Sequence, residues 1–166
     1  MRAKGRFLLV LVCLLLAPVS LGAADYKQWL PLLPESLGGL ARSGKPDGMN
    51  MEMGQQSWSS LQQEYSNKSK QVSMTIVSGI VAPQAQAFQM MSQMQMETED
   101  QIVKTLEVAG YKAVFQLEKE SKTGILTIAL NQQTLVAIEA KPTADEAELV
   151  GLAKEIPLNK IAAQAK

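Results

Sequence analysis

The sequence predicts a single α+β domain built on an antiparallel sheet and preceded by an export signal. Three observations lead to this prediction. Apolar and polar residues alternate in two separate blocks, as they do in half-buried strands. A segment rich in methionine, glutamine and alanine lies between the blocks and is typical of a helix. A second helical segment with one apolar face follows the last block and closes the chain.

The first block predicts a β-hairpin. Its strands are residues 58–65 and 71–77, and the turn-forming residues 66–69 separate them. The second block predicts a three-stranded antiparallel meander, because its connections are too short for any other pairing. The strands of the meander are residues 111–118, 125–130 and 134–140. Residues 102–107 are a further candidate strand, but their apolar spacing does not decide the question.

A methionine-rich helix and a C-terminal helix are expected to cover the sheet. Residues 82–96 contain no β-branched residue, and Pro83 stands where the first turn of a helix accepts proline. The second helix is expected to start at Thr143, because Thr143 and Glu146 have the spacing of a capping box. Pro157 should end or kink this helix. Its apolar face consists of Leu149, Leu152, Ala153 and Ile156.

The segment ahead of the hairpin, residues 25–48, has the least regular pattern. Apolar residues around Trp29 are interrupted by Pro31 and Pro34, and several glycines follow within a few residues. Such a composition favours an extended or loop-like segment over a regular element. We expect Trp29 and its neighbours to attach this segment to the domain.

Several segments resemble the small exported proteins of the PsbP and Mog1-like group. They are WLPLLP at residues 29–34, the strand containing Tyr65, the strand with Val72, Met74 and Ile76, the Gly110-Tyr111 start of the second block, and the closing helix at 149–156. The resemblance implies an α+β scaffold with an antiparallel sheet. Several uncharacterised periplasmic families belong to this group, and they share a scaffold while differing in function, so the resemblance implies no particular role.

Residues 1–24 are interpreted as a secretory signal peptide. Three cations and no acid occur in the first six residues, an unbroken apolar run follows at 7–16, and small residues suited to signal peptidase end the segment. The apolar stretch is interrupted by Pro18 and is shorter than the roughly 20 residues that span a membrane. The mature domain is therefore expected at residues 25–166, without a stable membrane span after cleavage. An uncleaved anchor is the alternative.

Removal of the signal would leave a mildly acidic chain without cysteine or histidine. The formal net charge would fall from 0 to −3, because three cations and no acid are removed. The only cysteine, Cys13, would be removed with the same segment. Export without disulfides indicates a bacterial periplasm, or secretion. An acidic balance argues against a nucleic-acid partner. The absence of histidine and cysteine excludes Ser-His-Asp and Cys-His catalysis and the usual zinc sites, so we expect no enzymatic activity.

Methionine is the unusual residue type of this chain. Met49, Met51 and Met53 alternate, so an extended backbone would project all three thioethers from one face. Four more crowd the first expected helix, at Met90, Met91, Met94 and Met96. Thioethers are soft ligands that select Cu(I), and Ag(I) by the same logic. Methionine also fills gaps in cores and forms adaptable binding surfaces, which is its more common use.

We therefore predict a non-enzymatic periplasmic accessory or binding protein that holds a cell-envelope protein or a small apolar ligand and needs no cofactor. The partner-binding residues are expected on the methionine-rich helix, at Phe88, Met90, Met91 and Met94. The alternative is a Cu(I)- or Ag(I)-binding protein. Its candidate metal ligands are Met49, Met51 and Met53. A metal site requires the two methionine clusters to approach each other, or one cluster to converge within itself.

Overall fold

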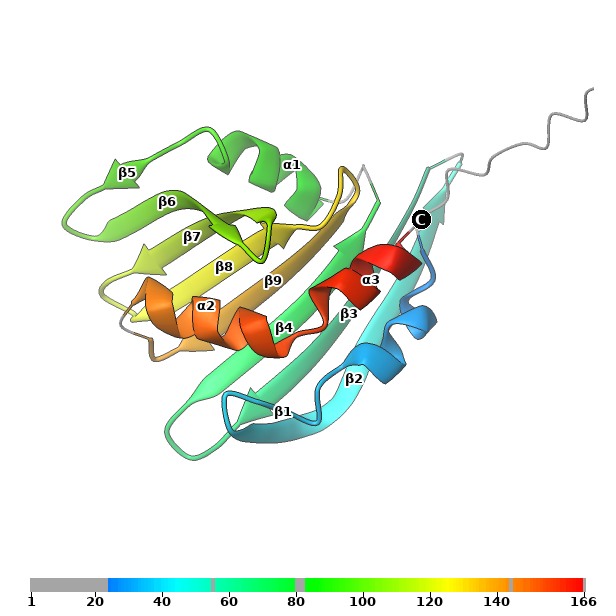
Figure 1. Ribbon diagram of the computed structural model, residues 1–166, viewed down its shortest axis with the longest axis horizontal. Coiled ribbons are helices and arrows are strands. Elements are labelled where there is room, and N and C mark those ends of the chain that lie inside the picture. Colours follow the sequence, from blue (N-terminus) through cyan, green and yellow to red (C-terminus); the bar gives the residue numbers. More distant parts are fainter. Residues whose placement is uncertain (1–23, 55, 80–82, 144, 166) are drawn as a thin grey trace, which may run out of the picture.

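The computed structural model describes residues 24–54, 56–79, 83–143 and 145–165, and their main element is one nine-stranded antiparallel sheet (Figure 1). The strands lie in the order β1-β2-β3-β4-β9-β8-β7-β6-β5. Their bounds are β1 Ser36–Leu37, β2 Leu40–Met53, β3 Gln56–Ser66, β4 Gln71–Ser78, β5 Met96–Glu97, β6 Gln101–Val108, β7 Tyr111–Glu118, β8 Thr123–Ala129 and β9 Thr134–Lys141. Apart from Ala24, the expected signal peptide lies outside the described residues.

The fold class expected from the sequence, an α+β domain with a hairpin plus a three-stranded meander, is wrong. The hairpin is β3 and β4 and the meander is β7, β8 and β9, but β4 pairs with β9 along its whole length, so both belong to one continuous sheet. The candidate strand at 102–107 is β6, and the sheet also contains β1, β2 and β5, which the pattern does not predict. The described chain is therefore more β-rich than an ordinary α+β fold.

The sequence of β2 does not predict a strand. It contains Gly44, Pro46 and Gly48, which favour a loop when the sequence is considered alone. The pairing of β2 with β3 shifts between Ser43 and Asp47, which places Pro46 in a bulge. Proline is tolerated in edge strands and at bulges, where no neighbour needs its missing N–H. About half of residues 25–48, which were expected to be irregular, therefore lie in strands. Pairing with neighbouring strands outweighs the local preference of this sequence for a loop.

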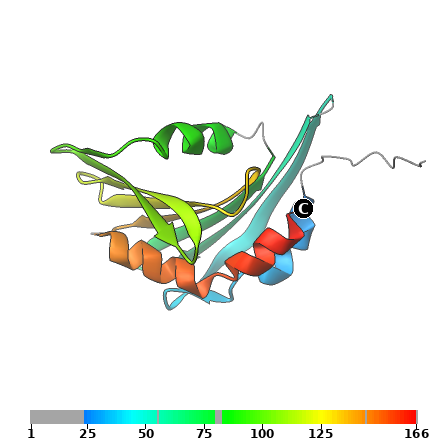
Figure 2. The same cartoon turned by 45° about the horizontal axis from the view of Figure 1, so that its top comes forward.

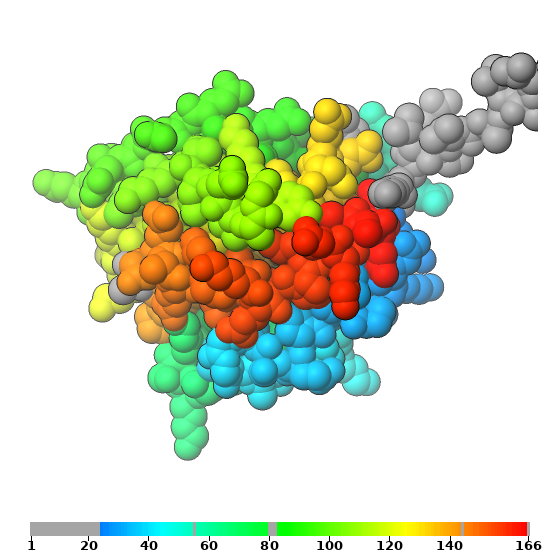
Figure 3. All heavy atoms as spheres, viewed as in Figure 1, coloured from blue at the N-terminus to red at the C-terminus, as the bar shows by residue number. Residues whose placement is uncertain are grey.

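Helical elements cover one face of the sheet, which we call the front face (Figures 1 and 2). They are α2 Glu146–Glu155, α3 Leu158–Gln164 and the 3₁₀ turns η1 Tyr26–Gln28 and η2 Leu30–Leu32. Alternate strand residues such as Met74, Leu126 and Ile138 are fully buried beneath them, together with Trp29 and Leu149. Figure 3 shows α2 and α3 as a continuous band across this side, with the N-terminal turns along one flank and residues of β6 and β7 along the other. The main hydrophobic core therefore lies on this side.

The start of α2 differs from the prediction, although its apolar face is confirmed. Asp145, and not Thr143, is the N-cap, and its carboxylate accepts a 2.9 Å hydrogen bond from the Glu148 backbone N–H. Thr143 donates its hydroxyl proton to the Glu148 carboxylate at 2.6 Å. Pro157 separates α2 from α3, as expected of a residue that cannot continue a helix. The four residues of the predicted apolar face are all buried.

The segment before β1 is held by side-chain hydrogen bonds to the carbonyl groups of Leu33 and Pro34, and Arg42 donates from Nη2 to the Leu33 carbonyl. Tyr65 of β3 donates its phenol O–H to the Pro34 carbonyl at 2.9 Å, and Arg42 of β2 donates from Nε to the same oxygen at 2.8 Å. Burial raises the pKa of Tyr65 above 10.0, against the smaller lowering effect of Arg42. Trp29 is fully buried and adds the apolar attachment expected from the sequence.

Candidate functional site

The opposite face of the sheet, which we call the back face, is covered only in part, by α1, Pro83–Met91 (Figure 2). The helix is shorter than the expected span of 82–96. After Met91 the chain turns, and Met96 enters the sheet in β5, where it pairs with Val103 of β6. The composition of residues 82–96 would permit a longer helix, but pairing of β5 with β6 draws the end of this segment into the sheet.

The side chains of Ala85, Phe88 and Met91 hold α1 on the sheet. Phe88 is only 7% exposed and packs in a small apolar cluster. The other buried members of that cluster are Val77, Ala85, Val103, Val114 and Leu135. Met91 is half-buried, and its sulfur accepts a hydrogen bond from Nε2 of Gln116 on β7. Most of the remaining α1 side chains are exposed, so the helix rests on a narrow strip.

An open cleft of about 250 Å³ lies between α1 and the back face. The helix lines it with Gln84, Ala87, Phe88 and Met91, and the sheet lines it with Thr75, Val77, Ile125, Thr127, Leu135, Ala137 and Glu139. Glu139 is the one charged side chain among these lining residues. The volume is slightly below the range of roughly 300–1,000 Å³ that is common for ligand pockets. Its size and lining suit a ring or a short alkyl chain.

A second hollow, of about 330 Å³, lies on the other side of α1. It is lined by Ala85, Phe88, Gln89, Ala129, Asn131, Gln132 and Leu135. Phe88 and Leu135 line both hollows and therefore form the boundary between them. The back face thus presents apolar surface on both flanks of a single helix.

Met49, Met51 and Met53 project from the back face, the side on which α1 lies. Met51 pairs with Trp58 of β3, and Trp58 packs against the Phe88 cluster. Residues two apart along a strand point to the same side, so the other two methionines share this orientation. Their exposed fractions are 40% for Met49, 38% for Met51 and 68% for Met53.

The two methionine clusters occupy one face but do not meet. α1 packs over β9, and β3 and β4 separate β9 from β2. At about 4.8 Å per strand, β2 therefore lies about 14 Å from β9. Along β2, side chains two residues apart stand about 6.8 Å from each other. A neighbouring pair such as Met49 and Met51 can approach one ion more easily than the outer pair can.

The four residues expected to bind a partner divide into two groups. Phe88 and Met91 line the cleft, as a binding role requires. Met90 is 70% exposed and does not line the cleft, and Met94 is 40% exposed and lies beyond the end of α1. The predicted one-turn spacing of Met90 and Met94 is therefore not realised on a helix.

Titratable groups with displaced pKa values lie away from the cleft. A hydrogen bond from the Asn50 side chain, followed by one from the Lys27 backbone, lowers the pKa of Asp25 at the front of β2.

Within the part of the chain that the structure describes, no group of three or more histidine, cysteine or acidic residues could hold a metal ion. The same residues include no helix long and apolar enough to cross a membrane.

The sequence pattern identified the helical side of the cleft but not its floor. Ile125, Thr127 and Ala137 are the outward residues of the meander, and they line the cleft. The available signal was composition, because an outward-facing row of small and β-branched residues is less polar than a solvated face requires. The pattern does not identify them as lining residues because it does not show which face of the sheet the methionine-rich helix covers.

Comparison with protein-family models, curated proteins and solved structures finds no match. The resemblance to the PsbP and Mog1-like group therefore stays a prediction. The fold and the site define the chain by class alone, as an antiparallel sheet protein whose back face forms an apolar cleft under one helix.

Proposed function

We propose that this chain is a non-enzymatic binding protein that holds a small apolar molecule between α1 and the back face of the sheet. The observation that carries the proposal is the cleft itself, whose walls are mainly apolar and which is open to solvent. The proposal includes the export expected from residues 1–24, and it places the protein in the periplasm or outside the cell.

The chemistry of the walls supports this choice of ligand. Phe88 and Met91 offer an aromatic ring and a polarisable thioether, both of which adapt to rings and alkyl chains. Each Å² of apolar surface removed from water contributes about 25 cal/mol, so even a small ligand gains from this cleft. The hydroxyl groups of Thr75 and Thr127 and the carboxylate of Glu139 supply the few polar contacts that orient a ligand.

The test uses an apolar fluorescent probe, N-phenyl-1-naphthylamine, titrated into the purified protein. Ala87→Trp fills the cleft from the helix side, and we expect it to weaken probe binding at least about tenfold. Gln86→Trp is the matched control, because Gln86 is the preceding exposed residue and lines neither hollow. The control should bind the probe within about twofold of the parent protein.

A second variant fills the same cleft from the sheet. Ala137→Phe places a ring on the floor and should also weaken probe binding, while circular dichroism checks that the strands are retained. Absence of saturable probe binding to the parent protein would refute the proposal. Equal affinities of the Ala87→Trp, Gln86→Trp and Ala137→Phe variants would show that the probe binds elsewhere.

The exposure of the β2 methionines favours a second candidate function, the binding of Cu(I) or Ag(I). Their sulfurs lie on one face and are not sealed in the core. The triple change of Met49, Met51 and Met53 to leucine should abolish competition with a chromophoric Cu(I) chelator, and Met90→Leu should not. If the parent protein fails to compete at sub-micromolar free ion, the metal function is refuted.

A further inference from the structure

The outer side of β2 is an open sheet edge. β1 is two residues long and pairs only with Leu40 and Ala41 of β2. Among the residues that the structure describes, no strand pairs with the outer side of β2 from Arg42 to Met53. A row of unpaired backbone N–H and C=O groups of this length is a template for pairing with another chain.

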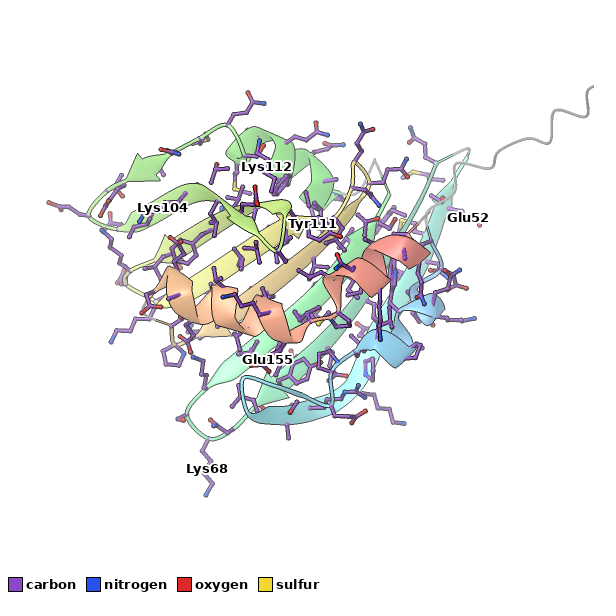
Figure 4. The ribbon with its side chains drawn as sticks, in the orientation of Figure 1. Glu52, Lys68, Lys104, Tyr111, Lys112 and Glu155 are labelled. Carbon is purple, nitrogen blue, oxygen red and sulfur yellow. The ribbon has the colours of Figure 1, made fainter. Side chains whose placement is uncertain are left out.

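The far end of this edge projects from the sheet as a two-stranded arm. β4 pairs with β3 only as far as Ser59, so Gln56 and Trp58 have β2 as their strand neighbour in the sheet. Figures 1 and 2 show the β2–β3 arm extending past the other strands, and Figure 4 places Glu52 on it, away from α2. A two-stranded ribbon is at best marginally stable in water and gains from a third strand.

The arm also exposes apolar surface next to that edge. Met49, Met51 and Met53 are three of the six large apolar side chains that are most exposed among the described residues. They form one row on the back side of β2, with Trp58 beside the middle one. An apolar row along an unpaired strand is the surface that an added strand would cover.

We propose that β2 pairs antiparallel with the β2 strand of a second copy of this chain, about a two-fold axis at Met51. This register sets Met51 opposite Met51 and Met49 opposite Met53, so all six thioethers cover one another on the back side. On the front side it sets Glu52 opposite Asn50, so no two like charges of the paired strands face each other, and the carboxylate of Asp25, which accepts from the Asn50 side chain at 2.9 Å, lies beside this pair. An axis at Asn50 would instead place Met53 against the carboxylate of Asp47.

Two features restrict the assembly to a closed dimer. The bulge between Ser43 and Asp47, with Pro46 inside it, ends the regular part of the edge. The two-fold contact uses the β2 edge of both copies, so neither copy keeps a free β2 edge for a third chain. The contact is therefore isologous, and it joins two sheets without leading to a filament.

Light scattering coupled to size-exclusion chromatography, over a dilution series of the purified protein, tests the dimer. Met51→Lys sets two ammonium groups against each other at the axis, and we expect the dissociation constant to rise at least about tenfold. Met90→Lys is the matched control, because Met90 is an exposed methionine on α1, and it should leave the dissociation constant unchanged.

Cysteine cross-linking tests the register, in a Cys13→Ser background treated with oxidised glutathione. Met51→Cys should form an intermolecular disulfide, because opposite residues at the axis have Cα atoms about 4.5–5.5 Å apart. Met53→Cys is more exposed but lies about 14 Å from its copy in this register, so it should not cross-link. A monomer at every concentration, equal effects of the two lysine variants, or equal cross-linking of the two cysteine variants would overturn the proposal.

Discussion

Replacing Leu152 with alanine tests whether the front core holds α2 on the sheet. Leu152 is 6% exposed, and a Cβ added to Gly38 would lie 2.4 Å from its Cδ2 atom, so the side chain packs directly against the loop before β2. Lys154 follows two residues later on the exposed face of α2. The change of Lys154 to alanine is therefore a matched control in the same helix.

The expected loss of stability follows from burial and from the space left behind. Burying a leucine side chain contributes about 1.5–3 kcal/mol. A residual cavity of about 50 Å³ adds about 1.2 kcal/mol, at roughly 24 cal/mol per Å³. The loop containing Gly38 can relax into part of this space, so we expect Leu152→Ala to cost about 3 kcal/mol. Lys154→Ala should cost less than about 0.5 kcal/mol.

Urea denaturation followed by tryptophan fluorescence measures both changes. With a denaturant slope of about 2 kcal/mol per M, the midpoint should fall by about 1.5 M for Leu152→Ala and by less than about 0.3 M for Lys154→Ala. Equal and small shifts would mean that α2 does not bury its apolar face against the sheet. The assignment of the main core to the front face would then be refuted.

Three further predictions concern single contacts. Tyr65→Phe removes the donor to the Pro34 carbonyl and should cost about 1 kcal/mol in denaturation at neutral pH. Because the pKa of Tyr65 is raised in the folded state, the parent protein should lose stability as the pH rises from 10.0 through the raised pKa, and an alkaline titration of the phenylalanine variant should lack this loss. Asp145→Ala removes the N-cap of α2 and should cost about 1 kcal/mol; a thermal melt unchanged from the parent would contradict the cap. Gly79→Ala should be strongly destabilising, since φ is +130° and the added Cβ would lie 2.5 Å from Cβ of Trp58; an unaltered melt and unaltered tryptophan emission would contradict this packing.

The sequence predicts elements whose pattern is local and misses those that depend on a distant partner. The alternation of Val72, Met74 and Ile76 repeats every second residue and marks β4 without further information. β2 has no such pattern, because most of its residues lie at an open edge and only its pairing with β3 makes it a strand. The capping residue of α2 was misplaced because Thr143 and Asp145 are both good N-caps, and only the backbone path selects Asp145.

The candidate site was predictable on one side only. Phe88 and Met91 were identified because they stand in a segment with an unusual composition. Ile125 and Ala137 were not, because a strand residue on the outer face reveals its neighbour only when the position of α1 is known. The same limit applies to the methionine clusters, since spacing along the chain does not tell whether β2 and α1 share a face of the sheet.

The unequal cover of the two sheet faces has a consequence for how such a chain can evolve. Among the described residues, the front cluster contains 26 buried apolar side chains and the cluster under α1 contains six. Stability is therefore concentrated on the side away from the cleft. Substitutions at Ala87 or Met91 can alter the shape of the cleft while the front core continues to fold the protein. New ligand preferences can arise on this scaffold by successive changes in α1 without passing through unfolded intermediates.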